Sequence, residues 1–253
     1  MFKEKVSRFN FLKCDNSHDN SKETIIFIHG ASINSNFFTN QIEYFCEKFN
    51  VYAPDLPGRN ENDYQGRNSV KEYADFIIDF IEDMNLSKPH ICGISMGGAI
   101  VLDILVRDYE NIGSGIVINS GARLQVLDMI FDSVAKDFEG FKKSMIKFGI
   151  SSKRDPSDLL NQMDNFCVSN PSAAMADFMA CMNYDLMDKV SDIKKRVLIL
   201  SADEDMSTPV KYGEYLHNNI PGSEFKILKE CGHLSPAEKP EEVNKAIEAF
   251  LKG

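Results

Sequence analysis

Residues 88–106 read KPHICGISMGGAIVLDILV, an apolar run that changes at its centre into a stretch of small residues. The part up to Ser95 is typical of a buried strand, and the part from Met96 is typical of the start of a helix. Between them lies Gly-x-Ser-x-Gly at residues 93–97. A serine on a sharp strand-to-helix turn is strained, and glycines two residues away on either side avoid clashes. The stretch therefore predicts a nucleophile elbow at Ser95.

The alternation of strand and helix recurs along the chain. Runs rich in apolar residues that fit buried strands lie at residues 24–30, 51–58, 114–120, 196–202 and 223–230. Helical patterns lie between most of them, the clearest over 69–84, where Ser69 is the expected N-cap and Glu72 completes a capping box. Residues 2–14 alternate apolar and polar and predict one antiparallel edge strand. We expect an α/β fold with a mostly parallel sheet and helices on both faces.

One stretch departs from this alternation. Residues 122–190 contain no convincing strand, only helical patterns, and they hold seven of the eleven methionines. We interpret them as a helical insertion. The expected organisation is a core made of residues 1–121 and 191–253, with 122–190 inserted into the same domain.

Composition excludes several classes of protein. A net charge of −10 disfavours nucleic acid as a partner, because its phosphates would be repelled. No stretch approaches the roughly 18 apolar residues of a membrane span, and the first residues lack the apolar run of a signal peptide. The six cysteines are scattered without CxxC spacing, and no His or Asp pair has metal-ligand spacing. We expect a cytoplasmic protein with reduced thiols and neither metal nor cofactor.

Five segments together resemble the α/β-hydrolase superfamily: IIFIHGASINSNFF, APDLPG, GISMGG, ILSADEDMSTP and KECGHLSPAEKPEEVNKAIEAFL. They occur in that family's order and cover nearly the whole chain outside the insertion. The resemblance implies a mostly parallel sheet of about eight strands and a helical cap over the active site. It also implies a catalytic triad in the order Ser, Asp, His.

The triad can be completed from two later motifs. His233 lies in ECGHLSPAEKP between an expected strand and the last helix, where it can take the serine proton. The resemblance places the acid four residues before the proline of a Thr-Pro pair, which selects Asp205, with Asp203 as the main rival. Some relatives carry the acid one strand earlier, but VINSG at 117–121 offers no carboxylate.

Further residues are assigned to the oxyanion hole and the substrate pocket. The N–H of Met96 is one expected oxyanion donor, and the resemblance implies the N–H of Ala31 as the second. Candidate substrate contacts are Ser32, Arg123, Met179 and Met182. Arg123 could meet a substrate carboxylate, and the methionines suit an apolar group. The insertion also holds a cationic cluster, which consists of Lys142, Lys143, Lys147, Lys153 and Arg154. We interpret it as a solvated helix face, with recruitment of an acidic substrate as the alternative.

These residues favour a serine hydrolase that cleaves a small, partly apolar carboxylic ester through an acyl-enzyme. A thioesterase, lactonase, C–C bond hydrolase or acyltransferase could share the same triad. A haloalkane dehalogenase is disfavoured, because its nucleophile is an aspartate where Ser95 stands. A ligand receptor on this fold is the alternative from a different class. The expected partner is a small molecule, and the sequence does not predict an oligomeric state.

Overall fold

The computed structural model describes residues 1–6, 8–14, 18–59 and 65–253, and its centre is one eight-stranded sheet. The strand order is β1-β2-β4-β3-β5-β6-β7-β8, and the six strands from β4 to β8 in this order run parallel to one another. The central strands are β3 (Thr24–Ile28), β4 (Asn50–Pro54), β5 (His90–Ile94), β6 (Gly115–Ile118), β7 (Val197–Ala202) and β8 (Glu224–Leu228). Parallel strands all end at the same edge, so the loops that follow them meet there.

The N-terminal residues form a hairpin and not the single edge strand that the alternation predicted. β1 (Phe2–Val6) pairs antiparallel with β2 (Phe9–Lys13), which in turn pairs antiparallel with β4. The burial patterns explain the error. β1 is largely exposed, whereas Phe9 and Phe11 of β2 are fully buried, so two different strands share one alternating pattern.

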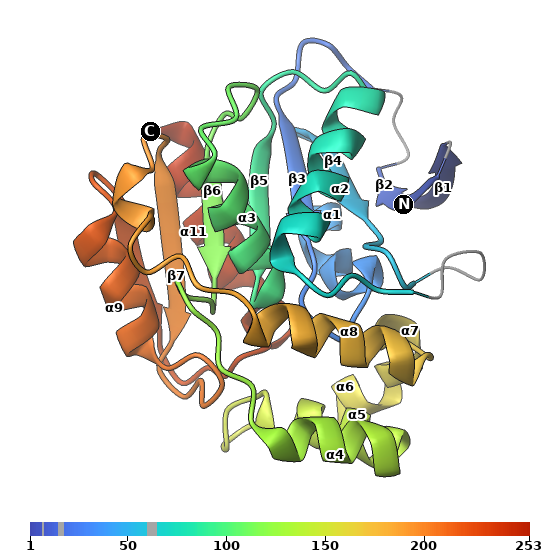
Figure 1. Cartoon of the computed structure of the whole chain (residues 1–253). Helices are drawn as coiled ribbons and strands as arrows, with labels where there is room; N and C mark the ends of the chain where they lie inside the picture. The colour runs from blue at the N-terminus through green and yellow to red at the C-terminus, as the bar shows by residue number, and fades with distance from the viewer. Residues whose placement is uncertain (7, 15–17, 60–64) are drawn as a thin grey trace.

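Helices cover both faces of the sheet (Figure 1). On one face, α2 (Val70–Asp83), α3 (Met96–Val106) and α9 (Val210–Asn219) pack over a core that includes Tyr73, Phe80 and Leu216. On the other face, η1 (Ser35–Phe38), α1 (Thr39–Phe45) and α11 (Pro240–Lys252) pack over a core that includes Phe45 and Phe250. The expected doubly covered sheet is therefore confirmed.

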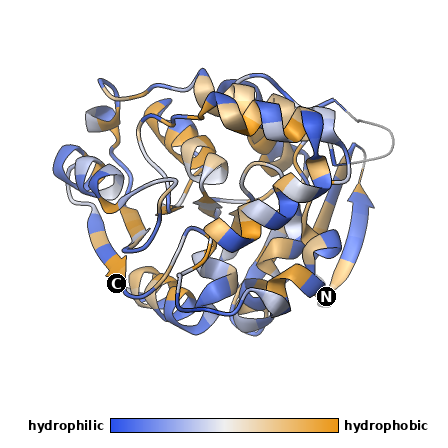
Figure 2. Ribbon diagram, turned by 90° about the horizontal axis from the view of Figure 1, so that it is seen from below, coloured by the Kyte–Doolittle hydropathy of each residue, from blue (hydrophilic) through white to orange (hydrophobic). Residues whose placement is uncertain are grey.

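The predicted helical insertion corresponds to a run of short helices below the carboxyl ends of the strands (Figure 1). They are α4 (Asp128–Lys136), α5 (Phe138–Phe148), α6 (Ser157–Asn161), α7 (Met163–Phe166) and α8 (Pro171–Met182). Figure 2 views the molecule from this side and shows hydrophilic and hydrophobic residues mixed along the helices. Among the described residues of 122–190, β-structure is limited to isolated bridges, one of them between Ile33 and Cys167.

Turns and caps place the remaining elements. α2 begins at its expected N-cap, where the Ser69 hydroxyl accepts a hydrogen bond from Glu72 N at 3.3 Å. η2 (Val190–Asp192) leads from the helical segment back to the sheet, and α10 (Ser235–Glu238) joins β8 to α11. Within the described ranges, no helix is both long and apolar enough to span a membrane.

The expectation of six reduced thiols is wrong for one pair. Cys14, just after β2, and Cys46, just after α1, form a disulfide. Their sequence separation of 32 residues carries no spacing signal, and only the packing of α1 beside the sheet brings them together. The other cysteines are free and buried. Disulfides are rare in a reducing cytoplasm, so the predicted location loses the support that reduced thiols would have given it.

Candidate active site

Ser95 occupies a sharp turn between β5 and α3. Its backbone has φ 54° and ψ −120°, a conformation that non-glycine residues seldom adopt. The flanking glycines make the turn possible: a Cβ on Gly93 would lie 2.1 Å from the Gly97 carbonyl oxygen, and one on Gly97 would lie 2.1 Å from the Ile28 oxygen. This is the geometry that the Gly-x-Ser-x-Gly pattern predicts for a nucleophile elbow.

His233 and Asp205 are brought together from the loops after β8 and β7. His233 Nδ1 donates to Asp205 Oδ2 at 2.7 Å. Asp205 also accepts hydrogen bonds from Ser207 N at 2.8 Å, from Thr208 N at 2.9 Å and from Thr208 Oγ1 at 2.7 Å. The proton on Nδ1 leaves Nε2 of His233 as the hydrogen-bond acceptor of the ring.

Each member of this pair shifts the other's pKa. Burial alone would lower the pKa of His233, but the charge of Asp205 and its hydrogen bond outweigh burial and raise it. Burial would raise the pKa of Asp205, but the charge of His233 and the hydrogen bonds from His233 and Thr208 hold it below the usual range. The pair therefore favours the ionised form of Asp205 and the protonated form of His233.

The neighbouring acids have other contacts. Asp203 accepts a hydrogen bond from Cys231 N at 3.4 Å. The Glu204 carboxylate accepts hydrogen bonds from Ser151 Oγ and Ser152 N, which follow α5. Of the acids in this loop, Asp205 is the one bonded to the histidine.

Asn119 joins the loops that carry the predicted triad, and sequence reasoning missed this contribution. Its side chain is fully buried. Nδ2 donates to the carbonyl oxygen of His233 at 2.8 Å, and Oδ1 accepts from Ala202 N at 2.9 Å at the end of β7. Asn119 itself has φ 44°, and asparagine is among the few residues that tolerate this region. An asparagine directly after a buried strand is the available sequence signal for this role.

The predicted oxyanion donors flank the elbow. Met96 is the first residue of α3, and the N–H at that position has no intrahelical partner. Ala31 follows Gly30, whose position lies against the elbow because a Cβ there would be 3.3 Å from Ser95 Cβ. Within the described ranges, the Ala31 N–H makes no hydrogen bond. Among the described residues, neither amide is used in a hydrogen bond, as the predicted role of oxyanion donor requires.

His29 fixes the loop on which Ala31 lies. Its Nε2 accepts a hydrogen bond from Leu56 N at 3.0 Å, so Nδ1 carries the proton and donates to the Gly30 carbonyl oxygen at 2.9 Å. Burial, aided by the charge of Arg59, lowers the pKa of His29 to about 3. His29 therefore stays neutral and acts as a structural brace.

The predicted substrate contacts lie in different environments. Ser32 is fully buried, and its hydroxyl has no partner among the described residues. Arg123 is half exposed, and Nη1 lies 3.7 Å from Asp185 Oδ2. Met179 and Met182 are part-exposed on α8, and Met179 lines a cavity of about 400 Å³ between α4 and α8. Among the described residues, no hydrogen bond or ion pair joins Arg123, Met179 or Met182 to His233 or Asp205, and their role stays a prediction.

The cationic cluster of the helical segment is not a uniformly solvated face. Lys142 is 4% exposed, and its Nζ lies 2.7 Å from Glu139 and 3.3 Å from Asp164. Lys142 is buried although both of its acidic partners are exposed, so the expectation of a solvated residue was wrong here. Lys153 and Arg154 also pair with acids, Glu230 and Asp158 respectively.

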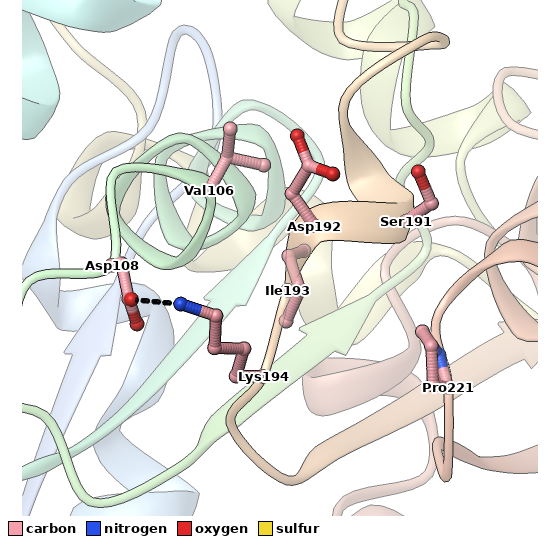
Figure 3. A pocket seen from close by; sticks show the side chains of 7 residues that line it. All are labelled: Val106, Asp108, Ser191, Asp192, Ile193, Lys194 and Pro221. Carbon is pink, nitrogen blue, oxygen red and sulfur yellow. Dashed lines mark hydrogen bonds and ion pairs between the residues drawn. The ribbon is translucent and has the colours of Figure 1, made fainter.

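A cavity of about 610 Å³ lies away from this site (Figure 3). It is lined by Val106, Asp108, Ser191, Asp192, Ile193, Lys194 and Pro221, and the side chains of Asp108 and Lys194 form an ion pair in it. Val106 ends α3, whereas Ser95 precedes its first residue, so the length of the helix, about 16 Å for eleven residues, separates the two regions. The cavity cannot hold a substrate against Ser95.

The sheet, the serine elbow and the histidine–carboxylate pair at one sheet edge define the class of α/β hydrolases. The model of the alpha/beta hydrolase family matches residues 25–246, and the chain belongs to this family and is a hydrolase. An uncharacterised hydrolase of Bacillus subtilis, YugF, is 24% identical over 247 residues, which cover 91% of this chain and 90% of the relative.

Solved structures agree on the fold. The enol-lactonase from Burkholderia xenovorans LB400 superimposes with a TM-score of 0.89 and 17% identity, covering 98% of each chain. An esterase from Exiguobacterium antarcticum superimposes with a TM-score of 0.84 and 20% identity, covering 97% of this chain and 96% of the esterase. At this level of identity the likeness concerns the fold.

The contacts of the acidic loop give a prediction that separates its acids. Asp205→Asn keeps the size of the side chain but removes the charge that selects the imidazole tautomer, so we expect kcat to fall by about 10⁴-fold. Asp203→Asn and Glu204→Gln leave the hydrogen bond between Asp205 and His233 intact and should change kcat only a few-fold. Steady-state kinetics of the purified variants, with circular dichroism to confirm folding, measure this. A dead Asp203→Asn with an active Asp205→Asn would contradict the assignment.

Proposed function

We propose that the chain is a serine hydrolase in which Ser95 is the nucleophile, His233 the general base and Asp205 the acid that orients the histidine. The observation that carries this proposal is the 2.7 Å hydrogen bond between His233 and Asp205. The two residues lie in the loops after β8 and β7, at the same edge of the sheet as Ser95, which follows β5. A free serine hydroxyl is a weak nucleophile, and an adjacent imidazole supplies the base that it needs.

In the proposed reaction, Nε2 of His233 takes the proton of the Ser95 hydroxyl while its oxygen attacks the substrate carbonyl. The N–H groups of Met96 and Ala31 donate to the resulting oxyanion. His233 then gives the proton to the leaving alkoxide, which leaves an acyl group on Ser95. A water molecule, deprotonated by the same histidine, attacks the acyl group. His233 then returns this proton to the Ser95 oxygen as the bond to the acyl group breaks, which releases the carboxylic acid and restores the free enzyme.

In the structure as described, Ser95 Oγ makes no hydrogen bond to His233. Catalytic hydrogen bonds are often long in the absence of substrate and tighten in the complex, so this does not argue against the pair. Hydrogen bonds to Ile118 and Asn119 connect the backbone at Ser95 with the backbone at His233, and these bonds support a short distance between the two side chains in the complex. Ser95 N donates to Ile118 O at 2.9 Å, and Asn119 Nδ2 donates to His233 O at 2.8 Å.

The proposed substrate is a small, partly apolar carboxylic ester. Two buried cationic side chains among the described residues, Arg59 and Lys142, support a neutral substrate, because each already forms an ion pair with an acidic side chain. Arg59 pairs with Asp177, and Lys142 pairs with Glu139 and Asp164. A substrate carboxylate that approached Arg59 or Lys142 would have to displace one of these acids. A cyclic ester is the second candidate, because an enol-lactonase superimposes on 98% of the chain and the same steps open a lactone.

Removing the nucleophile tests the proposal. Ser95→Ala should abolish hydrolysis of short-chain nitrophenyl esters, lowering kcat by at least about 10⁴-fold, because the acyl-enzyme cannot form. The control is Ser114→Ala, a buried serine that bonds to His90 away from the elbow, and it should keep the activity of the unmodified protein. Ester hydrolysis that survives in Ser95→Ala would exclude Ser95 as the nucleophile. Parallel assays with thioesters and lactones then rank the substrate classes.

The pH dependence of the rate follows from the raised pKa of His233. The base must be neutral, so kcat/KM should rise with pH through this pKa, at a higher pH than the value of about 6.5 of an unperturbed histidine. Asp205→Asn removes the negative charge that raises the pKa of His233, while burial still lowers this pKa. The acidic limb of the pH–rate profile for the residual activity should therefore move to lower pH. Rate profiles of both proteins, with Asp203→Asn as control, measure the shift. An acidic limb at the same pH in Asp205→Asn and the unmodified protein would contradict the proposed pairing of His233 with Asp205.

A further inference from the structure

The carboxylate of Asp177 is a point where the helical segment meets the core. Asp177 lies in α8 and is fully buried. Oδ2 accepts a hydrogen bond from Ser32 N at 2.8 Å, and Oδ1 accepts from Arg59 Nη1 at 3.0 Å and from the Tyr73 hydroxyl. The donors come from the loop after β3, the loop after β4 and helix α2. One side chain of α8 thus gathers three parts of the core.

Arg59 extends this contact. Its guanidinium forms a salt bridge with Asp177 in which both side chains are almost completely buried, and its Nε donates to the Ile33 carbonyl oxygen at 3.1 Å. Burial opposes the charge of Arg59, but the charge of Asp177 outweighs it and raises the pKa of Arg59. A buried ion pair seldom adds net stability, because desolvation offsets attraction. What it supplies is geometry, since the planar guanidinium and the carboxylate lock each other's orientation.

The loop held in this way is the one that carries Ala31. Ser32 has φ 62°, a left-handed conformation that a serine does not favour. The hydrogen bond from Ser32 N to Asp177 fixes the peptide plane between Ala31 and Ser32. Residues 166–168 add backbone contacts: Val168 N donates to Ser32 O at 3.0 Å, and Asn34 N donates to Phe166 O at 2.8 Å.

Both peptide planes beside Ala31 are therefore fixed, from opposite sides. On the core side, His29 Nδ1 holds the Gly30 carbonyl oxygen. In a planar trans peptide the N–H points away from the C=O, so this bond sets the direction of the Ala31 N–H. On the side of the helical segment, Asp177 holds the following plane through Ser32 N. Without Asp177, the left-handed Ser32 could relax, and the Ala31 peptide would lose one of its two supports.

We propose that Asp177, together with Arg59, is a positioning residue of the oxyanion hole, so that helix α8 completes the catalytic site of the core. The proposal rests on the proposed function, because it takes the Ala31 N–H as an oxyanion donor. Its consequence is that the Asp177 region of α8 stays attached during turnover. Asp177 contributes to the rate without touching the substrate.

The variant Asp177→Asn tests the proposal. It keeps the shape of the side chain but weakens the hold on Ser32 and leaves the charge of Arg59 without its partner. We expect kcat to fall 10- to 100-fold with KM nearly unchanged, less than the roughly 10²–10³-fold cost of losing an oxyanion donor outright. An alkylboronic acid, which forms a tetrahedral adduct with a nucleophilic serine, should bind more weakly by the same factor, because it uses the same donors.

The matched control is Lys142→Met. It breaks another ion pair of the helical segment, in which Lys142 is buried and its partners Glu139 and Asp164 are exposed. Among the described residues, the side chains of these three residues make no hydrogen bond or ion pair with the loops that carry Ala31, Asp205 and His233. Thermal unfolding of both variants separates a loss of stability from a loss of rate. If Asp177→Asn lowers kcat no more than Lys142→Met does, or if boronate affinity is unchanged, the proposal is overturned.

Arg59→Lys provides a second variant if Asp177→Asn does not fold. It keeps the buried charge but loses the paired geometry of the guanidinium, and it should lower kcat and boronate affinity together, by a smaller factor. Equal kcat and boronate affinity in Arg59→Lys and the unmodified protein would overturn the proposal. Ser95→Ala distinguishes a failure of the proposed function from a failure of the positioning role of Asp177. Activity that survives in Ser95→Ala refutes the proposed function, whereas an inactive Ser95→Ala with an unaffected Asp177→Asn refutes only the positioning role.

Discussion

The left-handed backbone of Ser95 is the constraint on which the site depends. At φ 54° and ψ −120° the chain turns sharply from β5 into α3, and the turn closes only because glycines stand at 93 and 97. The same tight packing sets the N-terminus of α3 against the end of β3, since any side chain at Gly97 would strike the Ile28 oxygen. The serine, the free amides at the start of α3 and the loop of Ala31 are thereby held side by side. Strain of this kind persists where the surrounding structure over-determines it.

Carboxylates tie the loops around that turn to the helical segment, two of them from the core and one from α8. Glu238 accepts hydrogen bonds from Gly232 N at 2.8 Å and from Ser151 N at 2.9 Å, so it ties the loop of His233 to the residues after α5. Glu204 binds the same residues from the loop of Asp205. Asp177 ties the loop that carries Ala31 to α8, because it accepts a hydrogen bond from Ser32 N. An aspartate or glutamate suits this task because one carboxylate accepts hydrogen bonds from several elements at once.

The parts of the site that the sequence predicted are those set by local chemistry. Gly-x-Ser-x-Gly after an apolar run specifies a turn by its own sterics, and the order of strand and helix patterns was enough to predict the sheet. Asp205 and His233 lie close to the strand ends that a parallel sheet brings together. The hairpin at the N-terminus was missed because two strands and their turn continue one alternating pattern.

The remaining features depend on distant pairs. Asp177 and Ser32 are 145 residues apart, and Asn119 and His233 are 114 apart, so no spacing rule connects them. The disulfide between Cys14 and Cys46 and the burial of Lys142 likewise follow from how elements pack. The sequence identifies such residues only as polar or charged. The fold determines which of them are buried and which groups they bind.

The proposed mechanism requires that Ser95 carries a covalent acyl group during turnover. Rapid mixing of the protein with an activated nitrophenyl ester, acid quenching within the first turnovers and mass spectrometry of the digested protein test it most directly. The account predicts a burst of nitrophenol and an added acyl mass on the peptide that contains Ser95, both absent in Ser95→Ala. Steady hydrolysis of the same ester without acylation of Ser95, or with the acyl group on another side chain, would contradict the account.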